Sequence, residues 1–444
     1  MKLQESRTNR LPVPPRVYVL DGVTILTIYL FLLYGIPSNR AIQALGSAGS
    51  VAVVWGVGAA LWWTWYQIQR TKPDEQQIGA HPVRIAAFLL VGSFLLSYVA
   101  AMIRPLPAEE AGPADTGLLR LVAWTGILLV TSDGPLTRER FMTLLRRVAL
   151  AGGLYSLLGL LQFATNRAFV DRIRIPGLVA RQGYDAVETL GGLTRPTSTA
   201  THPLEYAIVL AMILPLAITL ALYDRDRALA VRWGIVALVT LALAVSGSRS
   251  AYIGMAAGLV VLIPTLARRT RWAFALAAVG MVGIVFVAAP RVITNLRYSF
   301  LALAEDTSTT SRTDSYGLVI DTFLRSPFVG RGFGTFLPEY RILDNQYLQL
   351  LIEVGVVGLV AMAGLMVASI ACALSARRAS RDLLVRGIGA ALAASVVSGA
   401  ALLALFDAFS FPQAAGTLFL CFGLCGSYWR LNRNAAKSAA VMQL

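Results

Sequence analysis

The sequence is poor in lysine, histidine and cysteine, and each shortage narrows what the chain can be. Only three of its 39 basic residues are lysines, and 444 residues contain only two histidines and three cysteines. The cysteines (Cys372, Cys421 and Cys425) all lie inside or at the ends of apolar runs. They imply neither a disulfide framework nor a metal cluster. We therefore expect no metal and no other cofactor.

Charged residues are also scarce, and apolar residues come in long runs. Charged residues make up 14% of the chain and hydrophobic residues 56%, which is not the composition of a water-soluble domain of this length. A helix that crosses a bilayer needs about 20 consecutive, mostly apolar residues. Runs of this kind fall near residues 17–36, 44–66, 85–103, 117–132, 144–165, 203–223, 231–247, 251–267, 272–289, 346–374, 386–405 and 411–429. The sequence therefore predicts an all-α polytopic membrane protein with about twelve transmembrane helices in one domain, 1–444.

The distribution of basic residues predicts the orientation, because lysine and arginine are retained on the cytoplasmic side of short loops. With an uncleaved first helix and the N-terminus inside, 24 of the 39 basic residues face the cytoplasm, including all three lysines. We expect both termini in the cytoplasm and two large external loops, 166–202 and 290–345. The net charge of +15 then reflects contact with anionic membrane lipids rather than with nucleic acid.

All basic residues predicted to lie outside are arginines, and eleven of the fifteen fall in the two large loops. Guanidinium groups match phosphate oxygens and cannot lose their charge, so the loops indicate a phosphate or diphosphate ligand at the outer face. The alternative is compositional, since the chain uses 36 arginines overall. By contrast, Asp224-Arg225-Asp226 matches a metal-binding Asp-x-Asp but falls in a short cytoplasmic turn, where we expect a solvated loop.

Several segments at the predicted outer face carry candidate binding residues. Arg195 and His202 precede Pro203, which suits the first turn of a helix whose N–H groups favour an anion; His202 is equally well explained as a helix cap. Arg249 lies in the tight turn 246–250, where the alternative is that Ser250 caps the next helix and Arg249 reaches the membrane interface.

The second large loop contributes Arg312, an amphipathic helix over 316–324, and the segment 327–334. This segment carries Arg331 and three glycines that permit a tight turn and close approach of a ligand. Asp344 and Asn345 then open the tenth run, followed by Tyr347. Asp344 is a candidate acceptor for the proton of a substrate hydroxyl. An aspartate or asparagine at this position is equally typical of a helix N-cap.

Together these segments resemble the bacterial O-antigen ligase and O-antigen or exopolysaccharide polymerase superfamily. The resemblance rests on four stretches in order: 195–203, 248–250, 312–334, and Asp344-Asn345 followed by Gly355 and Gly358. It implies a GT-C-like, inverting and metal-independent glycosyltransferase in the bacterial cytoplasmic (inner) membrane, with an external active face. Such an enzyme moves a glycan from a polyprenyl-diphosphate donor to a sugar hydroxyl. Its partners are that donor, a glycan or lipid-core acceptor and membrane lipids, with a chain-length regulator as a further candidate.

The resemblance assigns roles to individual residues. It implies that Asp344, Arg195 and Arg312 are catalytic, with Arg249 as the other candidate for the diphosphate. Substrate-binding candidates are Arg249, His202, Asn345, Arg331 and Tyr347. Family ligases have a histidine before the asparagine, whereas this chain has Asp344, a weaker base than imidazole. That departure favours polymerase over ligase, and a flippase or other transporter is the alternative outside enzymes.

Overall fold

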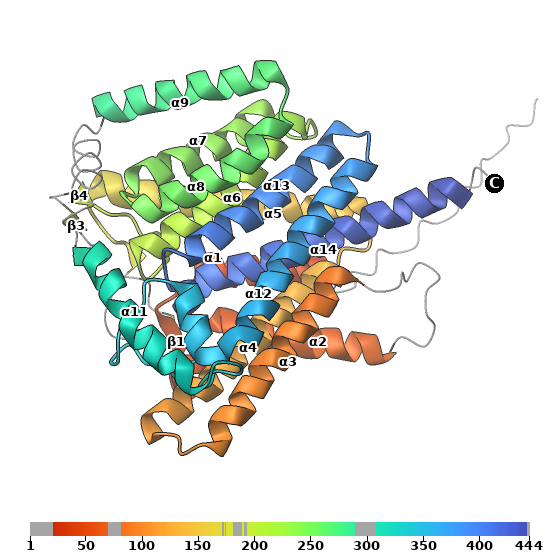
Figure 1. Ribbon diagram of the computed structural model, residues 1–444. Coiled ribbons are helices and arrows are strands. Elements are labelled where there is room, and N and C mark those ends of the chain that lie inside the picture. Colours follow the sequence, from red (N-terminus) through yellow and green to blue (C-terminus); the bar gives the residue numbers. More distant parts are fainter. Residues whose placement is uncertain are drawn as a thin grey trace, which may run out of the picture.

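The computed structural model describes residues 21–69, 81–170, 173, 175–180, 189–190, 193–288 and 307–441, and it is almost entirely helical there. Long helices pack along one another, with β3, β4 and α11 at one end of the bundle and the C-terminus at the other (Figure 1). The helices are α1 (Gly22–Gly35), α2 (Val51–Gln69), α3 (Pro82–Ile103), α4 (Ala108–Asp133), α5 (Arg138–Thr165), α6 (Pro203–Tyr223), α7 (Leu229–Val245), α8 (Arg249–Leu262), α9 (Arg268–Ala288), α11 (Thr307–Arg325), α12 (Gln346–Ala379), α13 (Leu383–Leu403) and α14 (Pro412–Val441).

A helix coincides with each of the twelve apolar runs. Six described helices are long and apolar enough to cross a membrane, namely α3, α4, α5, α6, α12 and α13. Three more apolar segments are shorter: α1, α7, and α8 with its 3-10 extension (Ile263–Thr265). These helices make the chain a multi-pass membrane protein, while twelve crossings and the cytoplasmic termini stay predictions. The helix expected near 316–324 is also present, as α11.

Ion pairs join helix ends that the charge pattern assigns to the cytoplasm. Arg140 on α5 pairs with Asp21 at the start of α1, with nitrogen and oxygen 2.5 Å apart. Arg146 on α5 binds Asp224 at the end of α6 at 2.7 Å. The prediction of a solvated loop at 224–226 is therefore wrong for Asp224, which is buried against Arg146. It is confirmed for Asp226, which is exposed. Helix ends predicted to share one side thus lie together.

The opposite helix ends meet in the same way. Strand β1 (Arg40–Ile42), which follows α1, pairs antiparallel with β2 (Leu178–Ala180) from the first large loop. The Ser38 N–H donates to the Thr199 carbonyl at 2.8 Å. A second short pair, β3 (Thr189–Leu190) with β4 (Leu193–Thr194), lies in the same loop. We call this end the outer end, following the predicted orientation.

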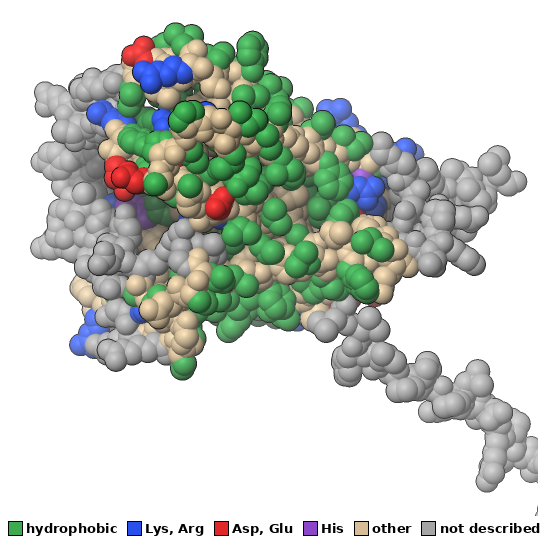
Figure 2. Space-filling model, turned by 90° about the horizontal axis from the view of Figure 1, so that it is seen from below, with side chains coloured by type: hydrophobic (Ala, Val, Ile, Leu, Met, Phe, Trp, Pro, Cys, Tyr) green, Lys and Arg blue, Asp and Glu red, His purple; other side chains and the backbone are tan. Residues whose placement is uncertain are grey.

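Apolar side chains cover the flank between the two ends. In the view of Figure 2, hydrophobic side chains fill most of the described central surface, and lysine and arginine side chains lie toward its two sides. Burial of α6, α13 and the first part of α14 is nearly complete. Large apolar residues on the peripheral helices are exposed, among them Leu61, Ile68, Leu89 and Leu154. An apolar belt between two polar ends is the surface that a bilayer requires.

Helix α12 is interrupted near its outer end, and a loop fills the interruption. Gly355 has φ +65° inside the helix, so the backbone hydrogen bonds break there. The segment 327–332 replaces them: the N–H groups of Arg331 and Gly332 donate to the Ile352 and Glu353 carbonyls at 3.0 and 2.8 Å. In return, the Val356 N–H donates to the Pro327 carbonyl at 2.9 Å. The loop and the broken helix therefore form one backbone unit.

Glycine is required where these two backbones meet. A side-chain carbon at Gly355 would overlap the Phe328 carbonyl, and one at Gly330 would overlap the backbone of Glu353. Both residues also have positive φ, which costs other residues about 1–2 kcal/mol. The glycines at 330 and 355 thus allow close approach of the chain to itself, whereas the sequence suggested approach to a ligand.

We expect Gly355→Ala to lower the free energy of unfolding by about 2 kcal/mol or more, because strain and overlap add. Gly364→Ala is the matched control, since Gly364 lies on the same helix with open space around it. Thermal unfolding of the purified variants in detergent measures the difference. Equal stability of the two variants would contradict this account of the α12 interruption.

Candidate active site

The segment 195–202 enters α6 through a well-defined cap. His202 is the N-cap, and its Nδ1 accepts a hydrogen bond from the Leu204 N–H at 3.1 Å. Pro203 occupies the first helical turn, where its missing N–H costs nothing. This is the cap alternative that the sequence left open for His202. Its ring also lies 6.1 Å from that of Phe411, between centroids.

Glu205, in the first turn of α6, joins three parts of the chain at the outer end. One carboxylate oxygen accepts hydrogen bonds from the Ser38 hydroxyl at 3.1 Å and from the N–H and hydroxyl of Thr201, both at 3.0 Å. The other accepts from the Gln413 N–H at 2.7 Å. The side chain has no solvent exposure. A buried carboxylate needs hydrogen-bond donors around it. Because the donors to Glu205 come from separate segments, the carboxylate holds those segments together.

Gln413 extends this network. Its amide nitrogen donates to the Leu33 carbonyl at 2.8 Å and to the Thr199 hydroxyl at 3.1 Å, and its oxygen accepts from the Tyr155 hydroxyl. The end of α1, the second half of α5, the segment 195–202 and the start of α14 are thereby held in one arrangement. The position of the loop that carries Arg195 is consequently fixed by buried polar contacts.

The loop 404–411 connects this network to the start of α12. The Phe409 N–H donates to the buried Gln346 side-chain oxygen at 2.8 Å. The same loop carries Asp407, which precedes the short 3-10 helix η5 (Ala408–Ser410). Phe409 also packs on Trp124 with centroids 5.1 Å apart. The loop thus brings a titratable group to the outer end.

Asp344 and Asn345 lie directly before α12. The sequence left two roles open at this point, a helix N-cap and an acceptor for a proton. Asn345 is the N-cap, because its side-chain oxygen accepts from the Tyr347 and Leu348 N–H groups at 3.0 and 3.2 Å. Asp344 is half-buried, and its charge acts on Asp407. Burial first, and then the Asp344 carboxylate, raise the pKa of Asp407 to about 6, against a lowering hydrogen bond from Ser410. Two coupled carboxylates therefore lie at this point of the outer end.

The Arg195 segment approaches the start of α8, the helix that carries Arg249. The Arg195 guanidinium acts electrostatically on Tyr252, one turn after Arg249 on α8. Leu402 of α13 packs so closely against Gly254 of α8 that a side-chain carbon there would overlap it. The outer ends of α8 and α13 are therefore side by side, and Asp407 follows α13 within a few residues. The cap of α8 is Ser248, whose hydroxyl accepts from the Ala251 N–H at 3.3 Å, and not the predicted Ser250.

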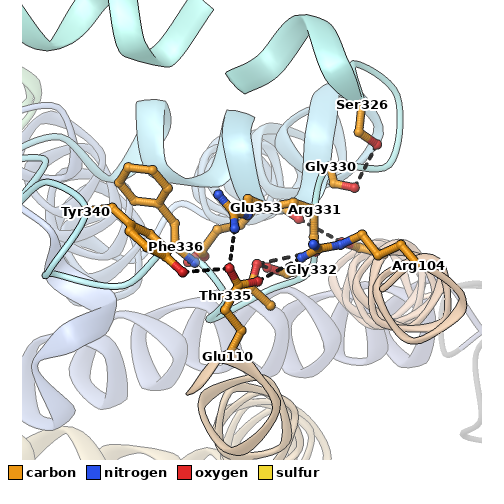
Figure 3. A network of polar contacts seen from close by, with 11 residues as sticks. Arg104, Glu110, Ser326, Gly330, Arg331, Gly332, Thr335, Phe336, Tyr340 and Glu353 are labelled. Atoms are coloured by element: carbon orange, nitrogen blue, oxygen red, sulfur yellow. Dashed lines mark hydrogen bonds and ion pairs between the residues drawn. The ribbon is translucent and has the colours of Figure 1, made fainter. Parts of the chain in front are cut away.

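Arg331 belongs to a separate polar cluster, drawn in Figure 3. It forms an ion pair with the fully buried carboxylate of Glu110, which also accepts from Arg104 at 2.9 Å and from the Tyr340 hydroxyl at 2.8 Å. The Arg331 guanidinium lies over the Tyr340 ring, 5.3 Å from its centroid. Arg104 in turn donates to the Arg331 carbonyl at 2.8 Å. These contacts attach the 330–340 segment to the start of α4.

The remaining predicted residues lie around this arrangement. The Tyr347 hydroxyl donates to the Ala400 carbonyl at 2.7 Å, which ties α12 to α13. Arg312 lies in α11, and its side chain falls outside the described part of the structure. In the described residues, the structure thus brings Arg195, Arg249, His202, Asp344 and Asn345 to one end.

Sequence reasoning missed Glu205, Gln413, Asp407 and Glu110. Glu205 had a local signal, because a glutamate three residues after an N-cap is the spacing of a capping box. It follows His202 at that spacing. The only local signal of Asp407 is its place just after the apolar run 386–405. Gln413 and Glu110 gave no signal, since their partners lie far away in the sequence.

One known protein family is similar to part of this chain. A multi-pass helical bundle with arginines and carboxylates at one end defines a membrane protein with a polar site at the membrane surface. Residues 234–363 match the family model described as O-antigen ligase. Residues 234–363, less than a third of the chain, are thus similar to the O-antigen ligase family, which supports the resemblance to the O-antigen ligase and polymerase superfamily. The match includes Arg249, Arg331, Asp344 and Asn345, and it ends before Asp407. A search of curated proteins finds no match.

We expect Glu205→Gln to lower the free energy of unfolding by about 1–3 kcal/mol. The glutamine puts an amide nitrogen in place of one carboxylate oxygen, so the buried groups that donate to that oxygen lose their acceptor. Glu139→Gln is the control: Glu139 is exposed in the first turn of α5, where loss of charge costs less than about 1 kcal/mol. Thermal unfolding in detergent compares the two. A Glu205→Gln protein as stable as the control would show that the carboxylate does not hold the outer end together.

Proposed function

We propose that the protein is a glycosyltransferase that moves a glycan from a polyprenyl-diphosphate donor to a sugar hydroxyl at the outer membrane face, most specifically an O-antigen or exopolysaccharide polymerase. O-antigen ligase or polymerase-type transfer at a membrane is what the family match supports. The observation on which the finer proposal rests is that the Arg195 segment approaches the start of α8, which carries Arg249, at the same end as Asp344 and Asp407.

The arginines supply what a diphosphate leaving group needs. Negative charge grows on the diphosphate as its bond to the sugar breaks, and fixed cations stabilise that charge best when they are already in place. Arg195 is held by the segment that Glu205 fixes, and Arg249 lies in the first turn of α8, whose N-terminal dipole also favours an anion. In this proposal Arg312 contributes from α11. No step requires a metal.

Asp344 is the proposed general base. The acceptor hydroxyl attacks the anomeric carbon of the donor sugar, its proton passes to the Asp344 carboxylate, and the bond from that carbon to the diphosphate oxygen breaks. Attack opposite the leaving group inverts the anomeric centre. The polyprenyl diphosphate departs with the bonding electrons, and Asp344 later returns its proton to water. Placing the two reactants on one rigid surface contributes to the rate as well.

Asn345 and His202 have a supporting place in the proposal. Asn345 fixes the start of α12 and so orients Asp344, and His202 fixes the start of α6 and so orients the Arg195 segment. Arg331 and Tyr347 lie at the margin, where part of each side chain is accessible. We propose that they contact the glycan rather than the diphosphate. Asp344 in place of a ligase histidine favours transfer to another lipid-linked glycan, while transfer to a lipid core is the second candidate.

The arrangement supports transfer better than transport. Transporters of known types place ion and substrate sites on paired broken helices near the middle of the bilayer. The break in α12 lies close to its outer end and is filled by the 327–332 segment. The site proposed here is at the surface of the bundle.

Replacing Arg195 or Arg312 with lysine tests the diphosphate role, because lysine keeps the charge and loses the guanidinium fork. We expect each change to slow transfer at least about tenfold, as for loss of one strong charge-assisted hydrogen bond. Arg167→Lys is the control, an exposed arginine of the same loop as Arg195. Gel analysis of glycan formed by purified protein gives the rates. Full polymer formation by both the Arg195 and Arg312 variants would refute the proposal.

The carboxylate pair predicts a pH dependence. As pH rises through about 6, Asp407 ionises, and the negative charge that it adds at this end favours loss of the proton from the acceptor hydroxyl. We expect the transfer rate to rise over this interval, and Asp407→Asn to lose that rise. Rates measured between pH 5 and 8 test it.

An Asp407→Asn profile with an unchanged rise would contradict the coupling. Asp344→Asn should abolish transfer at every pH, whereas Asp344→His, which restores a base, should retain part of it. A fully active Asp344→Asn protein would rule out Asp344 as the general base.

A further inference from the structure

A small hollow opens at the outer end beside the Glu205 network, between α1, α2 and the start of α14. The hollow is shallow, and the roughly 220 Å³ of non-atom space in it includes space that is open to the outside. One side is apolar, formed by Leu32, Leu33 and Ile36 of the α1 end, Val51 and Ala52 of α2, and Pro412. The other side is polar, formed by Ser38, Arg40, Ser50 and Gln413. The hollow thus has one face suited to a hydrocarbon and one suited to a charged group.

Arg40 is the charged group of this hollow, and part of it lacks a partner. Its Nε is buried and makes no hydrogen bond within the described part of the chain. No acidic side chain there lies within ion-pair distance of Arg40. Strand β1 holds its backbone, through pairing with Ala180 and a hydrogen bond from its N–H to the Pro37 carbonyl. A buried donor on a cation is costly unless an acceptor satisfies it.

Among the described residues, the polar groups around the hollow do not neutralise Arg40. Glu205 is the acid of the adjoining network, and donors from Ser38, Thr201 and Gln413 already engage its two oxygens. Gln413 is likewise committed to Leu33, Thr199 and Tyr155. The Ser50 hydroxyl adds a further donor at the rim. The described part of the hollow therefore offers donors, Arg40 among them, without an acceptor, and an anion with several oxygens would satisfy them.

The apolar side indicates that this anion is carried on a lipid. The outward faces of the same two helices expose apolar residues, including Phe31 on α1 and Val54 on α2. In a bilayer these faces contact hydrocarbon chains. A lipid chain lying along α1 and α2 would bring its phosphate to the level of Arg40, where the helices end.

We propose that the hollow binds the phosphate group of a membrane lipid, with Arg40 as its anchor. The site is distinct from the one formed by Arg195, Arg249 and Asp344, and it does not depend on the proposed glycan transfer. Bound lipid would hold β1, and through β1 the first large loop, against the ends of α1 and α2.

The test measures lipid binding by the purified full-length protein in detergent. Native mass spectrometry follows retention of added phosphatidylglycerol, and thermal unfolding follows the stabilisation it gives. We expect Arg40→Gln to bind phosphatidylglycerol about tenfold more weakly, as for loss of one charge-assisted hydrogen bond. Arg40→Lys should fall between this variant and the unchanged protein. Arg167→Gln, the same change at an exposed outer arginine, should bind normally.

Two further ligands identify what is recognised. Diacylglycerol, which has the chains and lacks the phosphate, should not stabilise the protein. Inorganic phosphate at the same concentration should have little effect, and full stabilisation by it would replace the lipid site with a site for free phosphate. Equal lipid binding by Arg40→Gln and Arg167→Gln would overturn the proposal. Unfolding without added lipid shows whether Arg40→Gln is itself folded.

Discussion

The buried carboxylate of Glu205 is the constraint on which the outer end of the molecule depends. A carboxylate that is out of contact with water must be surrounded by donors, because the cost of burying it otherwise amounts to several kcal/mol. Its donors come from the end of α1, from the segment before α6 and from the first turn of α14. Those three segments can satisfy Glu205 only when they meet. The position of Arg195 on one side and of the 404–411 loop on the other follows from that meeting.

A second constraint joins the other half of the outer end to this one. The interruption of α12 at Gly355 is filled by the 327–332 segment, and that segment leads into Arg331 and its ion pair with Glu110. Phe333, a few residues further on, packs within 6.4 Å of Phe409 in the 404–411 loop, between ring centroids. Asp344 follows the second of these regions in the chain, and its charge acts on Asp407 in the 404–411 loop. A rigid support of this kind is what surface chemistry on a membrane protein requires.

The helices were predictable from the sequence, and their contacts were not. An apolar run is a property of residues that are neighbours in the sequence, and all twelve runs coincide with helices. The cap at His202 is also a local feature, because Pro203 follows it directly. Glu205 and Gln413 are 208 positions apart, and no local pattern links them. The glycines of 327–334 permit close approach, but Gly330 meets the backbone of α12 and Gly334 that of Pro113, where the sequence suggested a ligand. Asp407 acquires its character only through burial beside Asp344, which composition cannot reveal.

The central claim is that this outer end transfers glycan from a polyprenyl-diphosphate donor. The most direct measurement supplies the purified protein, reconstituted in liposomes, with polyprenyl-diphosphate oligosaccharide as the sole substrate, and separates the lipid-linked products by gel. The account predicts a ladder of longer glycans on the lipid carrier. Product that forms only after a lipid-core acceptor is added would make the protein a ligase. Donor that moves between leaflets with no new glycosidic bond, whichever acceptor is present, would contradict the account.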